Sequence, residues 1–181
     1  MDDALAAQLI TVGATLGGVV LTLVGSALVE RRRAQEARRL ETVRLAAEHT
    51  KWLRDERMKA YAGFSLAGED VLQFLRAELP PLLEPDGPAR HAVVAEQWRE
   101  LRTAMRKAYN QVLLLGGEEP RTIALRNWRL ARNGGNDLLE DIAGNNIASD
   151  ELAGRVKEIG ARLGTETNNF LQACRDDLQG G

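Results

Sequence analysis

Residues 89–117, ARHAVVAEQWRELRTAMRKAYNQVLLLGG, carry the helical pattern that decides the fold. Apolar side chains recur along this stretch at steps of three and four residues, which places them on one side of a helix. These positions are Val94, Trp98, Leu101, Met105, Ala108, Tyr109, Val112 and Leu115. Gly116 and Gly117 follow and favour the end of the helix. The stretch therefore predicts an amphipathic helix with one face in a core.

Before this stretch, residues 30–79 contain no proline and predict one long helix. Within it, Gly63 and Gly68 each weaken the helix and mark places for a kink or break. Prolines from residue 80 onward end the helix, because proline lacks the amide donor and clashes with the preceding turn.

After it, residues 120–132 predict a third helix that ends at Gly134 and Gly135, with a separate short helical piece at 137–143. Residues 149–178 predict a last amphipathic helix. No stretch alternates convincingly between polar and apolar residues, so we expect an all-α fold, an up-down helical bundle. The expected core is made of large apolar side chains: Phe64, Phe74, Trp98, Leu101, Met105, Val112, Ile159, Leu163 and Phe170.

Residues 4–29 form a run of 26 positions without a charged side chain. At about 1.5 Å per residue a helix of this length spans roughly 39 Å, more than a hydrocarbon core of about 30 Å. Asp2 and Asp3 precede the run and three arginines follow it, and Lys/Arg flanks stay cytoplasmic. We therefore expect an N-terminal transmembrane helix in the cell's inner (plasma) membrane, with the N-terminus outside. A cleaved secretory signal and a buried helix of a soluble core are the alternatives.

The chain is thus expected to have three parts: a transmembrane anchor at 1–30, a basic juxtamembrane stalk helix at 31–52 and a cytosolic helical bundle at 53–181. Residues 30–59 carry a charge balance of +4, and residues 60–181 carry −4. Anionic headgroups attract juxtamembrane Lys and Arg. The membrane-surface residues we expect are Arg31, Arg32, Arg33, Arg38 and Arg39. A nucleic-acid footprint would be more basic and interleaved with aromatics, so nucleic acid is not expected.

A stripe of small and hydroxylated residues follows one side of the expected membrane helix: Thr11, Thr15, Gly18, Thr22 and Gly25. Such residues let two helices approach closely in lipid. The stalk continues with a thin apolar seam of Leu40, Val43 and Ala47, which suits a coiled coil. Both features predict a homo-oligomer; ordinary membrane-helix composition is the alternative for the stripe.

Few residues suggest chemistry. His49 and His91, the only histidines, have no second ligand at metal spacing. Cys174 takes an apolar position in the last helix and is expected to be buried. Adjacent carboxylates point about 100° apart on a helix and do not converge by spacing. We expect no catalytic residue, no metal site and no cofactor, and therefore not an enzyme.

The most distinctive segment is residues 52–64, WLRDERMKAYAGF. Its pattern, W-x-x-x-E-R-x-x-A-Y-x-x-F, resembles a segment of uncharacterised actinobacterial single-span membrane proteins with a cytoplasmic helical domain. The resemblance implies that architecture and transfers no activity. Trp52 lies about 100° from the core side, grouped with Glu56 and Lys59. Two interpretations stay open for this group: a solvated charged face, or a contact with a protein partner.

Together these features predict a membrane-tethered, non-enzymatic helical adaptor or scaffold that self-associates. The expected partners are membrane lipids, further copies of the chain and a cytosolic protein. The alternative is an oligomeric membrane-active effector or small channel formed by the N-terminal helix, which ion flux on expression would distinguish. A third class is an enzyme or small-molecule sensor with a pocket between bundle helices.

Overall fold

Helices make up nearly all of the structure, a computed structural model. It describes the backbone of residues 2–180 and the side chains of residues 30–33 and 35–180. The elements in chain order are α1 (Asp2–Ala77), the short 3-10 helix η1 (Pro80–Leu83), α2 (Gly87–Leu115), α3 (Glu118–Ala143) and α4 (Ser149–Gly180). No strand occurs in residues 2–180, so the prediction of an all-α helical bundle is confirmed. The chain divides into two units, Met1–Lys51 and Trp52–Gly181.

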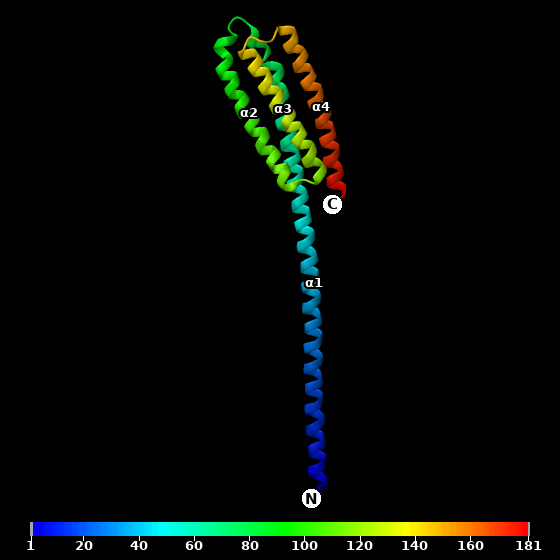
Figure 1. Ribbon diagram of the computed structural model, residues 1–181. Coiled ribbons are helices and arrows are strands. Elements are labelled where there is room, and N and C mark those ends of the chain that lie inside the picture. The colour runs from blue at the N-terminus through cyan, green and yellow to red at the C-terminus, as the bar shows by residue number, and fades with distance from the viewer. Residues whose placement is uncertain (1, 181) are drawn as a thin grey trace. The chain divides into compact units, whose positions relative to one another are not determined.

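The unit Trp52–Gly181 is a four-helix bundle in which consecutive helices run in opposite directions (Figure 1). Aromatic pairs join α1 to both of its neighbours: Phe74 stacks on Trp98 of α2 at 5.6 Å, and Phe64 meets Phe170 of α4 at 5.0 Å. Tyr109 of α2 stacks on Trp128 of α3 at 5.9 Å. Helix α3 also packs against α4, so that each helix of the bundle has two neighbours. Short connections between consecutive helices favour this antiparallel arrangement.

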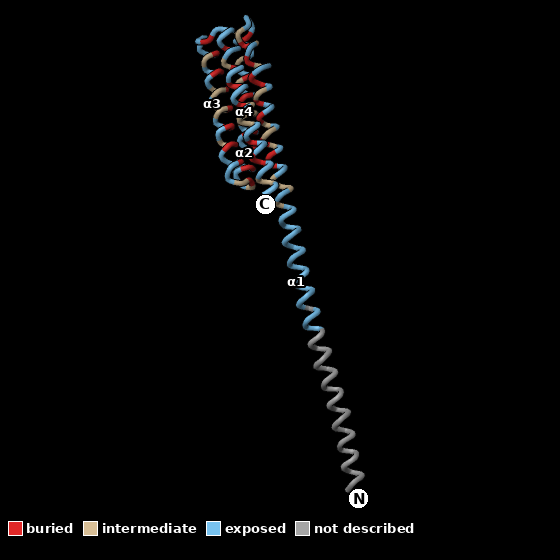
Figure 2. Tube along the Cα trace, turned by 90° about the vertical axis from the view of Figure 1, so that its right-hand side faces the viewer, coloured by how far each residue is buried: buried red, intermediate tan, exposed pale blue. Residues whose placement is uncertain are grey.

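The core follows the inner faces of the four helices (Figure 2). Eight of the nine predicted core residues are buried, with Val112 and Phe170 at 0 % exposure. The exception is Leu101, which is only partly buried and packs against the edge of the core. Leu79 and Leu82, in and beside η1, are buried as well and cover one end of the bundle.

The prediction that the third helix ends at Gly134 and Gly135 is wrong, because α3 continues unbroken to Ala143. Each glycine would cost a helix about 1 kcal/mol relative to alanine. Both lie against large neighbours: a Cβ on Gly134 would be 2.9 Å from Ile159 Cδ1, and one on Gly135 would overlap the Trp98 ring. The glycines therefore allow α3 to approach α4 and α2 closely. Likewise α1 shows no break at Gly63 or Gly68.

The predicted membrane span, residues 4–29, lies outside the residues whose side chains are described, together with its stripe of Thr11, Thr15, Gly18, Thr22 and Gly25. Among the residues that the structure describes, no helix combines the length and apolar character needed to cross a membrane.

Candidate functional sites

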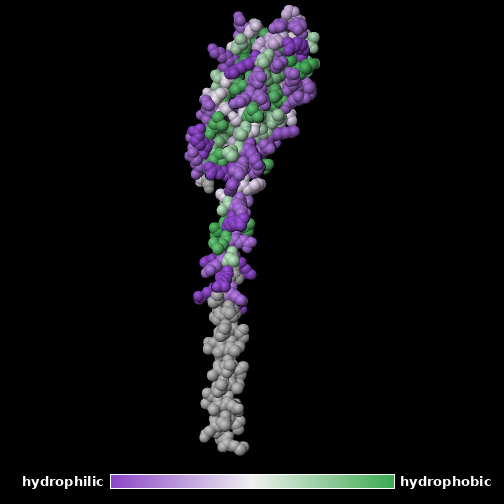
Figure 3. Space-filling view, turned by 180° about the vertical axis from the view of Figure 1, so that it is seen from behind, coloured by the Kyte–Doolittle hydropathy of each residue, from purple (hydrophilic) through white to green (hydrophobic). Residues whose placement is uncertain are grey.

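The first candidate site is the helical segment of α1 between Glu30 and Lys51. Every residue described in it is exposed, including Arg31, Arg32, Arg33, Arg38 and Arg39. Two seam residues are among the most exposed large apolar side chains of the structure, Leu40 at 73 % and Val43 at 68 %. Ala47 is exposed too. Figure 3 shows hydrophobic side chains between hydrophilic ones on this part of α1. Such a narrow apolar stripe has the width of a coiled-coil seam.

The second feature is the segment 52–64, and the structure explains most of its pattern. Arg57 Nε donates to the Leu115 carbonyl oxygen at 2.9 Å. That carbonyl is in the last turn of α2, where no backbone donor is left within the helix. Arg57 Nη1 also lies 3.5 Å from Asp177 Oδ2 on α4. One arginine thus connects α1 to the end of α2 and to α4.

Tyr61, one turn further along α1, completes this arrangement. Its Oη donates to Asp177 Oδ2 at 2.6 Å and accepts from the Gly117 amide at 3.2 Å. Its ring meets Phe170 edge to face at 5.8 Å. Burial raises the pKa of Tyr61, and its donation to the Asp177 carboxylate raises this pKa further. We call Arg57, Tyr61, Gly117 and Asp177 the Tyr61 network; it joins α1, the α2–α3 turn and α4.

Trp52, Glu56 and Lys59 of the segment are partly or fully exposed. Trp52 is 53 % exposed. Glu56 and Lys59 form an ion pair at 2.6 Å, with 30 % and 71 % of their side chains exposed. An exposed pair of this kind contributes little to stability. The structure therefore assigns Arg57, Ala60, Tyr61 and Phe64 to packing and leaves Trp52, Glu56 and Lys59 on the surface.

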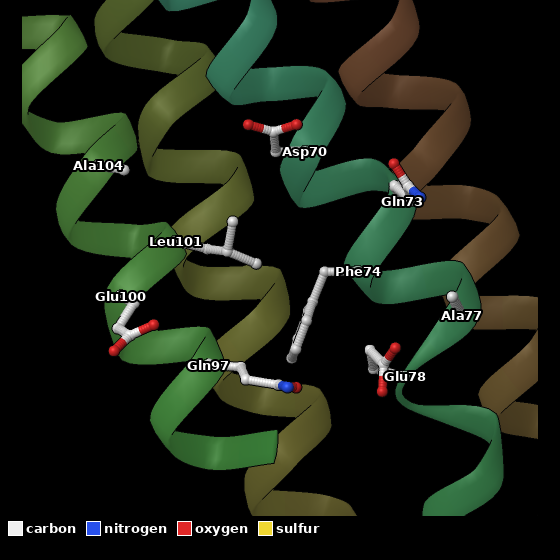
Figure 4. Close-up of a pocket in the computed structure, with 9 residues that line it drawn as sticks. All are labelled: Asp70, Gln73, Phe74, Ala77, Glu78, Gln97, Glu100, Leu101 and Ala104. Carbon is white, nitrogen blue, oxygen red and sulfur yellow. The ribbon is translucent and has the colours of Figure 1, made fainter. Parts of the chain in front are cut away.

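The third feature is a groove between α1 and α2 with a volume of about 480 Å³ (Figure 4). Phe74 and Leu101 point into it from opposite helices (Figure 4). Its walls carry three carboxylates, Asp70, Glu78 and Glu100. We call it the α1–α2 groove; all of its lining residues are Asp70, Gln73, Phe74, Ala77, Glu78, Gln97, Glu100, Leu101 and Ala104. Spacing within one helix did not reveal it, because its carboxylates converge only through the pairing of α1 with α2.

A comparable groove of about 500 Å³ between α3 and α4 is lined by four arginines, and three of them, all except Arg129, form ion pairs. Arg155 pairs with Asp141, and Arg162 lies 3.9 Å from Glu158. Arg126 lies 3.4 Å from Glu166. Arginines already paired in this way have less to offer a ligand than unpaired ones.

The residues with reactive side chains are dispersed. In the described part of the chain, no group of three or more His, Cys, Asp or Glu residues is arranged to hold a metal ion. Cys174 is buried in α4. Burial raises the pKa of the Cys174 thiol to about 12, with a smaller effect of Asp177. Since the thiolate is the nucleophile, this cysteine is inert at neutral pH.

Comparison with models of known protein families, with characterised proteins and with solved structures finds no match. The class that the fold and its surfaces define is therefore a helical bundle preceded by a basic helix, and its function must be argued from its own residues.

Replacing Tyr61 by Phe is expected to lower the free energy of unfolding of the unit Trp52–Gly181 by about 1–3 kcal/mol, because Asp177 and the Gly117 amide both lose a partner. Urea denaturation followed by circular dichroism measures this loss. The raised pKa of Tyr61 predicts a pH dependence as well. Above pH about 10 an unfolded tyrosine loses its proton while folded Tyr61 keeps it, so wild-type stability falls as pH rises.

The Phe variant lacks this contribution, so the stability difference between the two proteins should narrow above pH about 10. Tyr109 to Phe is the matched control, because no hydrogen bond of the described residues involves its hydroxyl. Equal stability of the Tyr61 variant and wild type at neutral pH would show that the Tyr61 network does not stabilise the bundle.

Proposed function

We propose that this protein is a membrane-tethered, non-enzymatic helical adaptor that self-associates through its N-terminal helix. The observation that carries the proposal is the exposed basic segment with its apolar seam, Leu40 at 73 % and Val43 at 68 %. This segment directly follows the uncharged run of residues 4–29. A bilayer gives the run its apolar surroundings and gives the arginines an anionic surface.

Self-association follows from the same helix. Leu40, Val43 and Ala47 are spaced by three and four residues, the spacing of one coiled-coil seam. Chains inserted in one membrane all share one topology, so tethering raises the local concentration of parallel seams. A short seam then suffices to hold copies together, and Arg44 paired with Glu48 at 2.8 Å supports the helix beside it.

An adaptor role accounts best for the surfaces of the bundle. Its one thiol is buried and protonated, and its carboxylates, apart from those of the α1–α2 groove, are dispersed or paired with arginine. The features that stand out are contact surfaces, namely the seam and the α1–α2 groove.

Membrane location is the first test. The full-length protein should sediment with membranes, and a reporter at its C-terminus should be active on the cytoplasmic side. Deleting residues 1–29 should move the protein to the supernatant. A C-terminal reporter active only outside would reverse the topology, and a truncated protein still in the pellet would exclude the run as the anchor.

Self-association is the second test. Changing Gly18 and Gly25 to Leu should lower crosslinking between full-length chains in membranes several-fold, because bulky side chains separate closely packed helices. The matched control changes Ala6 and Ala27 to Leu, which lie about 220° and 160° around an ideal helix from Thr11 and outside both the stripe and the Gly13-x-x-x-Gly17 motif. Equal crosslinking in both variants and wild type would exclude the stripe as the interface between chains. Ion flux on expression would instead favour the membrane-active effector.

A further inference from the structure

The α1–α2 groove has an apolar floor, and an exposed apolar residue flanks each of its ends. Phe74 is buried at the floor and Leu101 is partly buried beside it. Leu66 lies one helical turn before Asp70 on α1 and is 60 % exposed. Val93 lies one turn before Gln97 on α2 and is 61 % exposed. Because α1 and α2 are antiparallel, these two exposed residues flank opposite ends of the groove.

The charge of the groove is of one sign. Asp70, Glu78 and Glu100 line it, and none of its lining residues is Lys or Arg. Glu78 forms an ion pair with Arg90 at 3.8 Å, so the uncompensated carboxylates of the groove are Asp70 and Glu100. Asp70 and Glu100 form neither an ion pair nor a side-chain hydrogen bond with any residue of the described chain. Both residues line the groove and are exposed to solvent without a charged partner, in contrast to Arg126 and Arg155 between α3 and α4.

We propose that the α1–α2 groove binds a cationic amphipathic helix of a partner protein, and this assignment rests on the adaptor function proposed above. Apolar side chains of the partner contact Phe74 and Leu101, and its Lys or Arg side chains pair with Asp70 and Glu100. From Asp70 to Glu78 the groove follows α1 for about 12 Å. That length accommodates about two turns of helix, with apolar contacts at i, i+3 or i+4, and i+7.

The shape of the groove favours a helix over a compact small molecule. Two apolar residues that flank its ends, Leu66 and Val93, are more than half exposed, so an elongated amphipathic ligand has apolar contacts beyond the groove itself. A second copy of the chain is the competing occupant, and crosslinking of the groove variant distinguishes it from a partner helix.

The test measures the fluorescence anisotropy of a labelled synthetic peptide titrated with the full-length protein in detergent micelles. The peptide has about 14 residues, with Leu on one helical face and Lys on the other. A second peptide replaces every Lys by Glu, and micelles without protein give the background. We expect the Lys peptide to bind and the Glu peptide to give only background.

Two double variants locate the binding. Asp70→Asn with Glu100→Gln removes both unpaired charges at constant shape and should weaken binding of the Lys peptide about tenfold. Glu140→Gln with Glu158→Gln removes two exposed charges elsewhere and should leave binding unchanged. Leu66→Gln should weaken binding several-fold, whereas Leu114→Gln, at a position 78 % exposed outside the groove, should not.

Equal binding to the two double variants, or no binding above background, would overturn the proposal. Reduced chain-to-chain crosslinking in the Asp70→Asn, Glu100→Gln variant would also overturn it, because a second copy would then occupy the groove. Membrane sedimentation and crosslinking of the wild-type protein are measured independently of peptide binding. A failure of peptide binding therefore leaves the tethered adaptor standing, and a failure of membrane association is recognised independently of the peptide result.

Discussion

Replacing Phe170 by Ala is expected to lower the free energy of unfolding of the unit Trp52–Gly181 by about 3–5 kcal/mol. The side chain is 0 % exposed. Its ring contacts two aromatic rings of α1, Phe64 at 5.0 Å and Tyr61 at 5.8 Å, both in edge-to-face geometry. The substitution removes these contacts and leaves a cavity between α1 and α4. Urea denaturation followed by the helical circular dichroism signal measures the loss.

The neighbouring residue provides the control. Leu171 follows Phe170 on α4 and is 42 % exposed, so Leu171→Ala should cost well under the Phe170 value. Similar losses for the two variants would mean that Phe170 does not hold α4 against α1. The Tyr61 network should weaken along with Phe170→Ala, because the aromatic ring of Tyr61 rests on the Phe170 side chain.

Apolar spacing was sufficient to predict the helices and most of the core. Val94, Trp98, Met105 and Val112 were expected on one face of α2, and all four are buried. Leu101 fits the same spacing but lies at the edge of the core beside the α1–α2 groove, only partly buried. Spacing gives the direction of a side chain on its own helix; how far the neighbouring helix covers it depends on packing.

Glycine pairs show where local sequence is insufficient. Gly116 and Gly117 separate α2 from α3, whereas Gly134 and Gly135 lie inside α3. The two pairs have the same intrinsic helix preference. Both lie where another element comes close: Tyr61 and Asp177 at the first pair, Ile159 and Trp98 at the second. Those neighbours are distant in sequence, so only the folded structure distinguishes a pair that ends a helix from one that packs within it.

The candidate sites also contain features that the sequence predicts and features that only the folded structure reveals. The sequence pattern separated Trp52 from the core side of its helix, and Trp52 is exposed. It did not identify Asp177, which is 116 residues from Tyr61 and supplies the acceptor of the network. It also missed the α1–α2 groove, because Asp70 and Glu100 belong to different helices and share a groove only after α1 and α2 pair.

The second large effect is expected at Gly135. Alanine normally stabilises a helix by about 1 kcal/mol relative to glycine. At Gly135, however, the new Cβ would overlap the Trp98 ring. That ring stacks on Phe74 at 5.6 Å, and its Nε1 donates to Asn136 Oδ1 at 2.8 Å, so it has little freedom to move. We therefore expect Gly135→Ala to destabilise the bundle by about 3 kcal/mol, the upper range for overpacking.

Substitutions at two further glycines test whether the change in stability differs in sign and size between positions. Gly154 lies within α4 with nothing within 4 Å of an added Cβ, so Gly154→Ala should stabilise by about 0.5–1 kcal/mol. Gly134→Ala meets only the Ile159 side chain, at 2.9 Å from its flexible Cδ1 end, and should fall between the other two. Urea denaturation of the three variants measures this order. Stabilisation by Gly135→Ala would mean that α3 does not approach Trp98 closely, because helix preference alone raises stability at every one of these positions.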